Sequence, residues 1–311
     1  MSVPATQTHN LSLKKNIGNS VEKNNNYRTQ LLDRRILEKR IGEAVVFLRQ
    51  NNIEPILIKG WAAARFYPNK IDRQFGDVDL TVSPAKYQNA LKVLEGYKNK
   101  DLIDLHEGVR HLDSLSFEDL YSNSILIECY DQEIRILRPE DHLRVLCVHW
   151  LTDGGAYKDR LWDIFYAIEN RPADFDWDRC VNTVSATRRK WIVCAIGIAH
   201  TYLGLDLSDT PLADEAREIP RWLIKAVERE WESNIKLMSL DQFLDDRREL
   251  WRQIKKRFPP NPIQSTVNME GEFDNSPRII YQIPDIFMRL KPSLKRILKT
   301  ISNIRFKDEA V

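Results

Sequence analysis

Two aspartates placed two residues apart are the strongest chemical signal in the sequence. Asp77 and Asp79 lie in a segment, residues 77–82, that alternates as a strand does, so we expect both side chains on one face. Carboxylates held together without a basic neighbour repel one another, and a divalent cation removes that repulsion. Because oxygen ligands suit hard cations, the pair predicts a Mg²⁺ site, with Mn²⁺ as the alternative ion.

A third carboxylate on a neighbouring strand would complete such a site. Asp104, in the strand-like run from Leu102 to His106, is the first candidate. Glu128 takes that role instead if the run from Ile125 to Tyr130 forms the adjacent strand. Paired metal ions about 3.5–4 Å apart clamp the attacking and leaving oxygens of a phosphoryl transfer. The acids therefore predict that chemistry, although an Asp-x-Asp pair alone also occurs in solvated turns.

Basic residues and glycines near the acids indicate an anion-binding turn. Lys59 and Gly60 follow a short apolar run, and a glycine there lets backbone N–H groups approach a phosphate. Lys59 and Arg73 supply positive charge for the same anion, and Gly76 directly precedes the first acid. We expect these four residues to bind a triphosphate, while Arg73 could instead pair with Asp77 in an ion-free site.

The surrounding patterns place these residues in a small α/β (α+β) core with a mixed sheet. Apolar residues from Leu37 to Leu48 recur on one helix face, and Ser83-Pro84 begins a second helix that Gly96 can end. A third, short helix is expected from Trp61 to Tyr67. The predicted strands are residues 55–58, 77–82, 102–106, 125–130 and 133–137, the last two as a hairpin.

Domain organisation follows from changes of pattern along the chain. Residues 1–26 are polar and read as a disordered tail, and residues 27–138 form the predicted core. After Pro139 helical periods dominate, so residues 139–258 are expected to form an all-helical domain. Residues 259–311 are expected to be a partly ordered, basic C-terminal tail, which could contact a membrane surface or a nucleic acid.

Taken together, these motifs resemble the uncharacterised nucleotidyltransferase family of the DNA polymerase beta-like nucleotidyltransferase superfamily. The signature lies in Ile56 to Val82, ILIKGWAAARFYPNKIDRQFGDVDLTV, and residues 103–106 resemble the family's third-acid strand, an acid followed by leucine and histidine. Residues 137–143 resemble the start of its helical domain, and His149 with residues 161–163 resemble later motifs. One departure is Lys59-Gly60-Trp61 where the superfamily usually has a glycine-serine turn.

The resemblance implies transfer of a nucleoside monophosphate from a nucleoside triphosphate to an unknown hydroxyl or phosphate, releasing pyrophosphate. Asp77, Asp79 and Asp104 would then be the catalytic metal ligands. One alternative is a toxin-type nucleotidyltransferase acting on transfer RNA. The other is a catalytically silent nucleotide-binding scaffold protein. Asp163 is expected either to brace Lys158 or Arg160 or to face the nucleotide.

Composition sets few limits on the partners. The net charge is +2 in 311 residues, so any basic binding surface must be local. The N-terminus has no apolar signal region and no run is long enough to cross a bilayer, so we expect a cytoplasmic protein. The cysteines form no zinc-binding or CxxC spacing and are predicted to be buried free thiols: Cys129, Cys147, Cys180 and Cys194.

Overall fold

The computed structural model describes residues 31–68, 73–109 and 115–289, except residues 234, 236, 239 and 244. The predicted tail of residues 1–26 and the basic residues from Lys291 to Lys307 lie outside the described residues. The chain forms two compact units. Among the described residues, unit 1 comprises 31–62, 73–108 and 124–136, and unit 2 comprises 63–68, 109, 115–123 and those from 137 to 289.

Unit 1 contains a five-stranded mixed sheet with the order β3-β2-β1-β5-β4. β2 pairs with β1 in antiparallel and with β3 in parallel, while β1 pairs with β5 in parallel and β4 with β5 as an antiparallel hairpin. This confirms the predicted mixed-sheet core and its hairpin. The strands are β1 Ile56–Leu57, β2 Val78–Val82, β3 Ile103–Glu107, β4 Ile125–Cys129 and β5 Gln132–Ile136.

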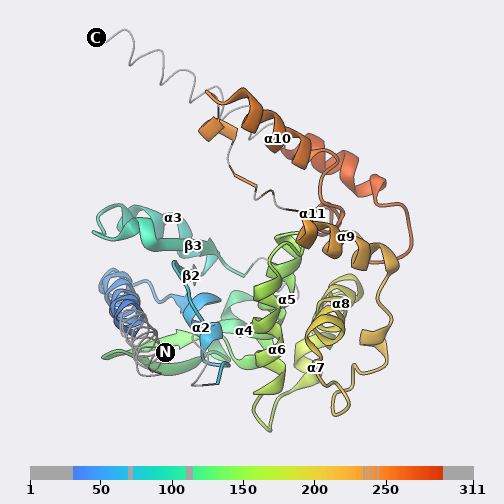
Figure 1. The fold of residues 1–311 in the computed structure, drawn as a ribbon. Helices are drawn as coiled ribbons and strands as arrows, with labels where there is room; N and C mark the ends of the chain where they lie inside the picture. Colours follow the sequence, from blue (N-terminus) through green and yellow to red (C-terminus); the bar gives the residue numbers. More distant parts are fainter. Residues whose placement is uncertain are drawn as a thin grey trace, which may run out of the picture. The chain divides into compact units, whose positions relative to one another are not determined.

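Two helices of unit 1 lie where the apolar spacing predicts, whereas the short helix expected from Trp61 to Tyr67 ends at Ala64. A helix through residues 31–50, blue in Figure 1, buries Ile41, Ala44, Val45 and Leu48 in the same apolar cluster as the central strands. The helix α3, Pro84–Glu95, begins at the predicted proline and ends before Gly96. It links the parallel strands β2 and β3, because a parallel pair needs a crossover connection. The short helices are α2 Gly60–Ala64, which begins in this unit, and η1 Lys100–Leu102.

Unit 2 is helical, and its core surrounds α8, Ala186–Leu203, which α5 and α6 contact (Figure 1). Gly197 lies where η3 crosses this helix, and a Cβ there would clash with the Ala216 carbonyl oxygen. Glycine is therefore required for the close approach of the two backbones. The other helices are α4 Phe117–Ser122, α5 Pro139–Thr152, η2 Lys158–Arg160, α6 Leu161–Glu169, α7 Trp177–Asn182, η3 Glu215–Arg217, α9 Arg221–Glu232, η4 Leu240–Phe243, α10 Arg247–Arg257, α11 Pro262–Asn268 and residues 279–289.

A buried ion network holds several of these helices together. Asp141 on α5 is fully buried and accepts hydrogen bonds from Arg144 at 2.5 Å and from Arg179 of α7 at 2.8 Å. Arg179 also donates to Asp119 of α4 at 2.9 Å, so α4 belongs to this unit. Residues 115–123, which the sequence assigned to the core, thus cluster with the helices of unit 2, because Asp119 pairs with Arg179 there.

The segment after Pro259 is built into unit 2 as far as the structure describes it. Ile263 and Val267 of α11 are buried in the same apolar cluster as Trp150 and Trp191. Residues 259–289, which the sequence assigned to the partly ordered tail, therefore contribute to the core. In the described part of the chain every helix is too short or too polar to span a bilayer.

The four cysteines are free and buried, as the sequence predicted. Cys129 belongs to unit 1, and Cys147, Cys180 and Cys194 belong to unit 2. Burial raises the pKa of Cys129, Cys180 and Cys194 to about 12, and raises that of Cys147 well above its ordinary value.

Candidate active site

Two neighbouring parallel strands bring the predicted acids together. In the β2–β3 ladder Asp79 lies opposite Asp104, and Thr81 lies opposite His106. Side chains two residues apart on a strand share a face, so Asp79, Asp104 and His106 point to the same side of the sheet. One ligand atom from each of the three lies within 4.8 Å of the others.

Lys59 completes this cluster from the turn after β1. Its Nζ lies 2.5 Å from Asp79 Oδ1 and 3.3 Å from His106 Nε2. His106 Nε2 lies 3.1 Å from Asp79 Oδ1 and 3.2 Å from Asp104 Oδ2. The Lys59 and Asp79 side chains are only 11% and 7% exposed, so this ion pair is largely withdrawn from water. The Asp104 side chain is 55% exposed and faces solvent.

The Asp79 carboxyl is held ionised by these neighbours. Burial, the largest influence, acts to raise its pKa, but the hydrogen bond from His106 and the charge and hydrogen bond of Lys59 together outweigh burial. The pKa of Asp79 therefore lies below its ordinary value. Asp79 is thus a buried carboxylate with Lys59 and His106 as its two neighbours, and a positive charge beside it is stabilised.

The turn at Lys59-Gly60 has a left-handed backbone, as a sharp turn after a strand requires. Lys59 has φ 56° and Gly60 has φ 34°, conformations that glycine adopts readily and lysine does not. A Cβ added to Gly60 would lie 3.6 Å from the Asp77 carbonyl oxygen and 3.8 Å from Asp79 Oδ2. The strained Lys59 backbone directs its side chain to the acids. Such local strain persists only where surrounding structure enforces it.

The remaining predicted residues lie at the start of β2. Asp77 is exposed and precedes the first strand residue, and the cluster of three ligands described above does not include it. A Cβ on Gly76 would meet open space, so the backbone there is accessible to a ligand. The Arg73 guanidinium donates a hydrogen bond to the Gln74 carbonyl at 3.0 Å.

Glu128, the rival third acid, lies far from this cluster. It is on β4, at the opposite edge of the sheet from β3, where it is exposed and lies opposite Glu133. Asp104 is therefore the carboxylate that the sheet places beside Asp79. His106 was not among the metal ligands predicted from the sequence. Its spacing of two from Asp104 was the signal that could have identified it as a third donor.

Two other residues singled out from the sequence have structural partners in unit 2. Asp163 is buried and accepts a hydrogen bond from the Tyr67 hydroxyl at 2.7 Å. His149 Nε2 lies 3.0 Å from the Arg160 guanidinium, close to the end of α5.

A sequence model of the uncharacterised nucleotidyltransferases matches residues 9–204. The chain belongs to this uncharacterised nucleotidyltransferase family. The matched part of the chain includes Lys59, Asp79, Asp104 and His106. A comparison with curated proteins finds no match.

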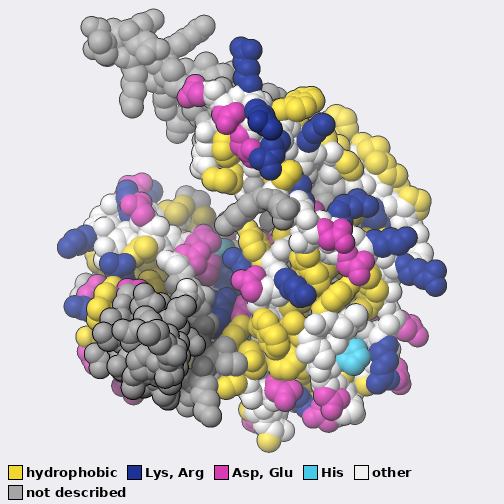
Figure 2. Space-filling model, viewed as in Figure 1, with side chains coloured by type: hydrophobic (Ala, Val, Ile, Leu, Met, Phe, Trp, Pro, Cys, Tyr) yellow, Lys and Arg dark blue, Asp and Glu magenta, His cyan; other side chains and the backbone are white. Residues whose placement is uncertain are grey.

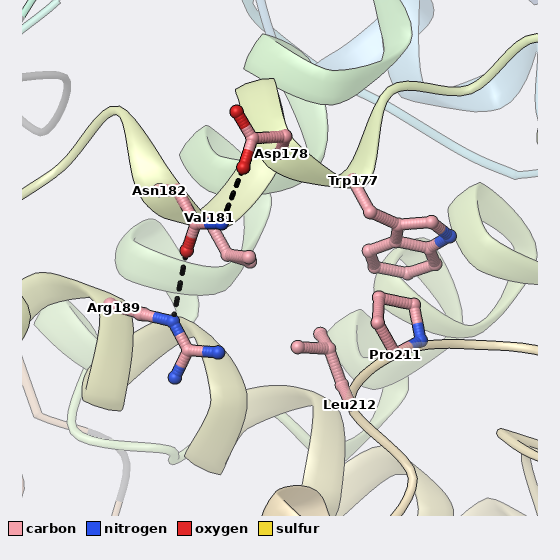
Figure 3. Close-up of a pocket in the computed structure, with 7 residues that line it drawn as sticks. All are labelled: Trp177, Asp178, Val181, Asn182, Arg189, Pro211 and Leu212. Carbon is pink, nitrogen blue, oxygen red and sulfur yellow. Dashed lines mark hydrogen bonds between the residues drawn. The ribbon is translucent and has the colours of Figure 1, made fainter.

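Unit 2 also has a small pocket of about 220 Å³, which lies between α7, α8 and the segment at Pro211 and Leu212. Figure 3 shows that its polar side chains bond to one another: Asn182 donates to Asp178 at 2.6 Å and accepts from Arg189 at 3.3 Å. Arg189 also pairs with Glu215. This pocket gathers no cluster of acids, so the β2–β3 cluster is the candidate active site.

Proposed function

We propose that this protein is a metal-dependent nucleotidyltransferase that transfers a nucleoside monophosphate from a nucleoside triphosphate to an acceptor hydroxyl or phosphate. Membership of the family supports the reaction class. The observation that carries the proposal is the register of β2 and β3, which sets Asp79 opposite Asp104 beside Lys59 and His106.

The residues present fit a divalent cation. Asp79 and Asp104 offer carboxylate oxygens and His106 offers an imidazole nitrogen, and we propose Asp77 as a further carboxylate from the start of β2. The position already attracts positive charge, since the Lys59 ammonium lies against Asp79. When bound, Mg²⁺ or Mn²⁺ would neutralise the charge that develops on the phosphoryl oxygens.

The basic and glycine residues would bind the triphosphate. We propose that Lys59 and Arg73 contact its anionic oxygens, and that the backbone near Gly60 and Gly76 approaches it closely. Lys59 is suited to bind a phosphate because its side chain is flexible, so that its ammonium group can contact either a carboxylate or a phosphate. The Gly76 backbone adjoins open space, so a ligand can reach it.

The proposed reaction is a displacement at the α-phosphorus. An acceptor oxygen forms the new P–O bond, the bond to the bridging oxygen of the β-phosphate breaks, and pyrophosphate leaves. Asp104 is the carboxylate best placed to accept the proton of an acceptor hydroxyl, because its side chain is half exposed while Asp79 is buried. Positive charge from Lys59 and Arg73 would stabilise the leaving pyrophosphate.

Incubation with each α-labelled nucleoside triphosphate, Mg²⁺ or Mn²⁺ and fractions of a cell extract tests this function. We expect one nucleotide to label an acceptor and release pyrophosphate, and Asp79→Asn to abolish labelling. Labelled transfer RNA would identify the toxin-type reaction. Nucleotide binding without transfer in any fraction, unchanged in Asp79→Asn, would instead indicate a silent scaffold and contradict the proposal.

A further inference from the structure

The last described helix, residues 279–289, turns its polar side toward the protein. Asp285 is fully buried and accepts hydrogen bonds from Ser265 at 2.6 Å and Asn268 at 3.0 Å, both on α11. Gln282 donates to the Pro260 carbonyl at 2.5 Å. Arg289, the last described residue of the helix, pairs with Asp285 at 2.6 Å. Polar contacts therefore hold this helix on unit 2, which is the reverse of an ordinary surface helix.

The opposite side of the helix is apolar and faces solvent. Its exposed residues recur at helical spacing and are 48–67% exposed, and apolar side chains cover this part of the surface in Figure 2. The charged residues of the helix, Asp285 and Arg289, are engaged with each other on the inner side. Continuous exposed apolar surface of this kind marks an interaction site. The apolar face, as we call it, comprises Ile279, Ile280, Ile283, Phe287 and Met288.

The sequence that follows the helix is strongly basic. Between residues 290 and 307 it contains no acid and carries six basic residues, which are Lys291, Lys295, Arg296, Lys299, Arg305 and Lys307. Leucines and isoleucines separate these charges. Apolar side chains next to lysine and arginine are typical of protein segments that bind at the interface of anionic bilayers.

We propose that the apolar face docks on a membrane surface bearing anionic lipid headgroups. Charge complementarity favours this occupant over a second copy of the chain, because a second copy carries the same basic sequence after residue 289 and so offers no complementary charge for it. A nucleic-acid backbone would match the positive charge but would leave the aliphatic side chains of Ile279, Ile280 and Ile283 without an apolar partner. Only a lipid surface offers both acyl chains and negative charge.

Vesicle flotation with the full-length protein tests the proposal. Vesicles of phosphatidylcholine alone are compared with vesicles that also contain phosphatidylglycerol, at low and high salt. The variant Ile283→Ser with Phe287→Ser removes two exposed apolar side chains and leaves Asp285 untouched. Leu126→Ser is the matched control, because Leu126 on β4 is as exposed as Ile283, at 48%. Circular dichroism checks that each variant is folded.

We expect the protein to float with the anionic vesicles and much less with phosphatidylcholine, and binding to weaken at high salt. The double variant should bind about tenfold more weakly or worse, since apolar burial is lost, while Leu126→Ser binds normally. Absence of flotation would overturn the proposal. So would a wild-type dimer that the double variant converts to monomer without vesicle binding, or binding to a short RNA but to no vesicle.

Discussion

Replacing Lys59 by methionine should show how much the buried ion pair with Asp79 contributes to the stability of the protein. The substitution keeps an unbranched side chain of similar length and the same left-handed backbone, but it removes the ammonium 2.5 Å from Asp79. Removing one partner of a buried ion pair costs about 3–5 kcal/mol, because the other charge is left uncompensated. His106 remains 3.1 Å from Asp79, so we expect the lower end, about 3 kcal/mol.

The same variant should respond more strongly to metal. In the wild-type protein a cation that binds Asp79 must compete with the Lys59 ammonium, whereas in Lys59→Met it meets an unpaired carboxylate. Since an ion that binds only the folded state stabilises it, Mn²⁺ or Mg²⁺ should raise the melting temperature of the variant more than that of the wild type. Metal should thus restore much of the stability that the substitution removes.

Urea unfolding followed by circular dichroism, with and without Mn²⁺, measures both effects. Lys92→Met on α3 is the control, because Lys92 belongs to the same unit and is exposed. It should shift the free energy of unfolding by less than about 0.5 kcal/mol and leave the metal response unchanged. A Lys59→Met protein as stable as the wild type, or one with a weaker metal response, would refute the reasoning.

Other substitutions test the remaining parts of the site. Asp77→Asn combined with Asp79→Asn should erase the metal-induced rise in melting temperature and reduce nucleotide transfer by orders of magnitude, whereas Glu128→Gln should change neither. The lowered pKa of Asp79 means that its ion pairs stabilise the fold above about pH 4 and that this contribution is lost as the pH falls through the folded pKa. The difference in urea midpoint between the wild type and Asp79→Asn should therefore narrow in acid, and a constant difference would contradict this. Tyr67→Phe leaves the buried Asp163 carboxylate without that donor and should cost about 1–3 kcal/mol by thermal unfolding.

Local patterns predicted most of unit 1. The alternation in residues 77–82 and 102–106 corresponds to β2 and β3, and the helix between them begins at Pro84 as expected. A connection of one helix favours parallel neighbours, and the parallel register of β2 and β3 sets Asp104 beside Asp79. These features depend on residues close in sequence, so the sequence alone reveals them.

Features that depend on strand order and long-range pairing were not predictable in the same way. Glu128 remained a rival until the hairpin was seen on the far side of β1. The contact between Lys59 and Asp79 joins the turn after β1 to strand β2, and no local pattern distinguishes it from a phosphate contact. The helix α4 was missed because its six residues are too few to show a helical period, although Ser116 accepts a capping hydrogen bond from the Asp119 amide at 3.0 Å.

The four buried cysteines are divided between the two units, so their reactivity can report local opening of each unit. A buried thiol with a raised pKa reacts with an alkylating reagent only during the moments when the surrounding structure opens. Cys129 reports on unit 1, while Cys147, Cys180 and Cys194 report on unit 2. Pulsed alkylation followed by peptide mass spectrometry would therefore measure the rate of local opening in each unit separately, with no introduced label. The same experiment with a nucleotide or a metal ion would show in which unit the ligand slows this opening.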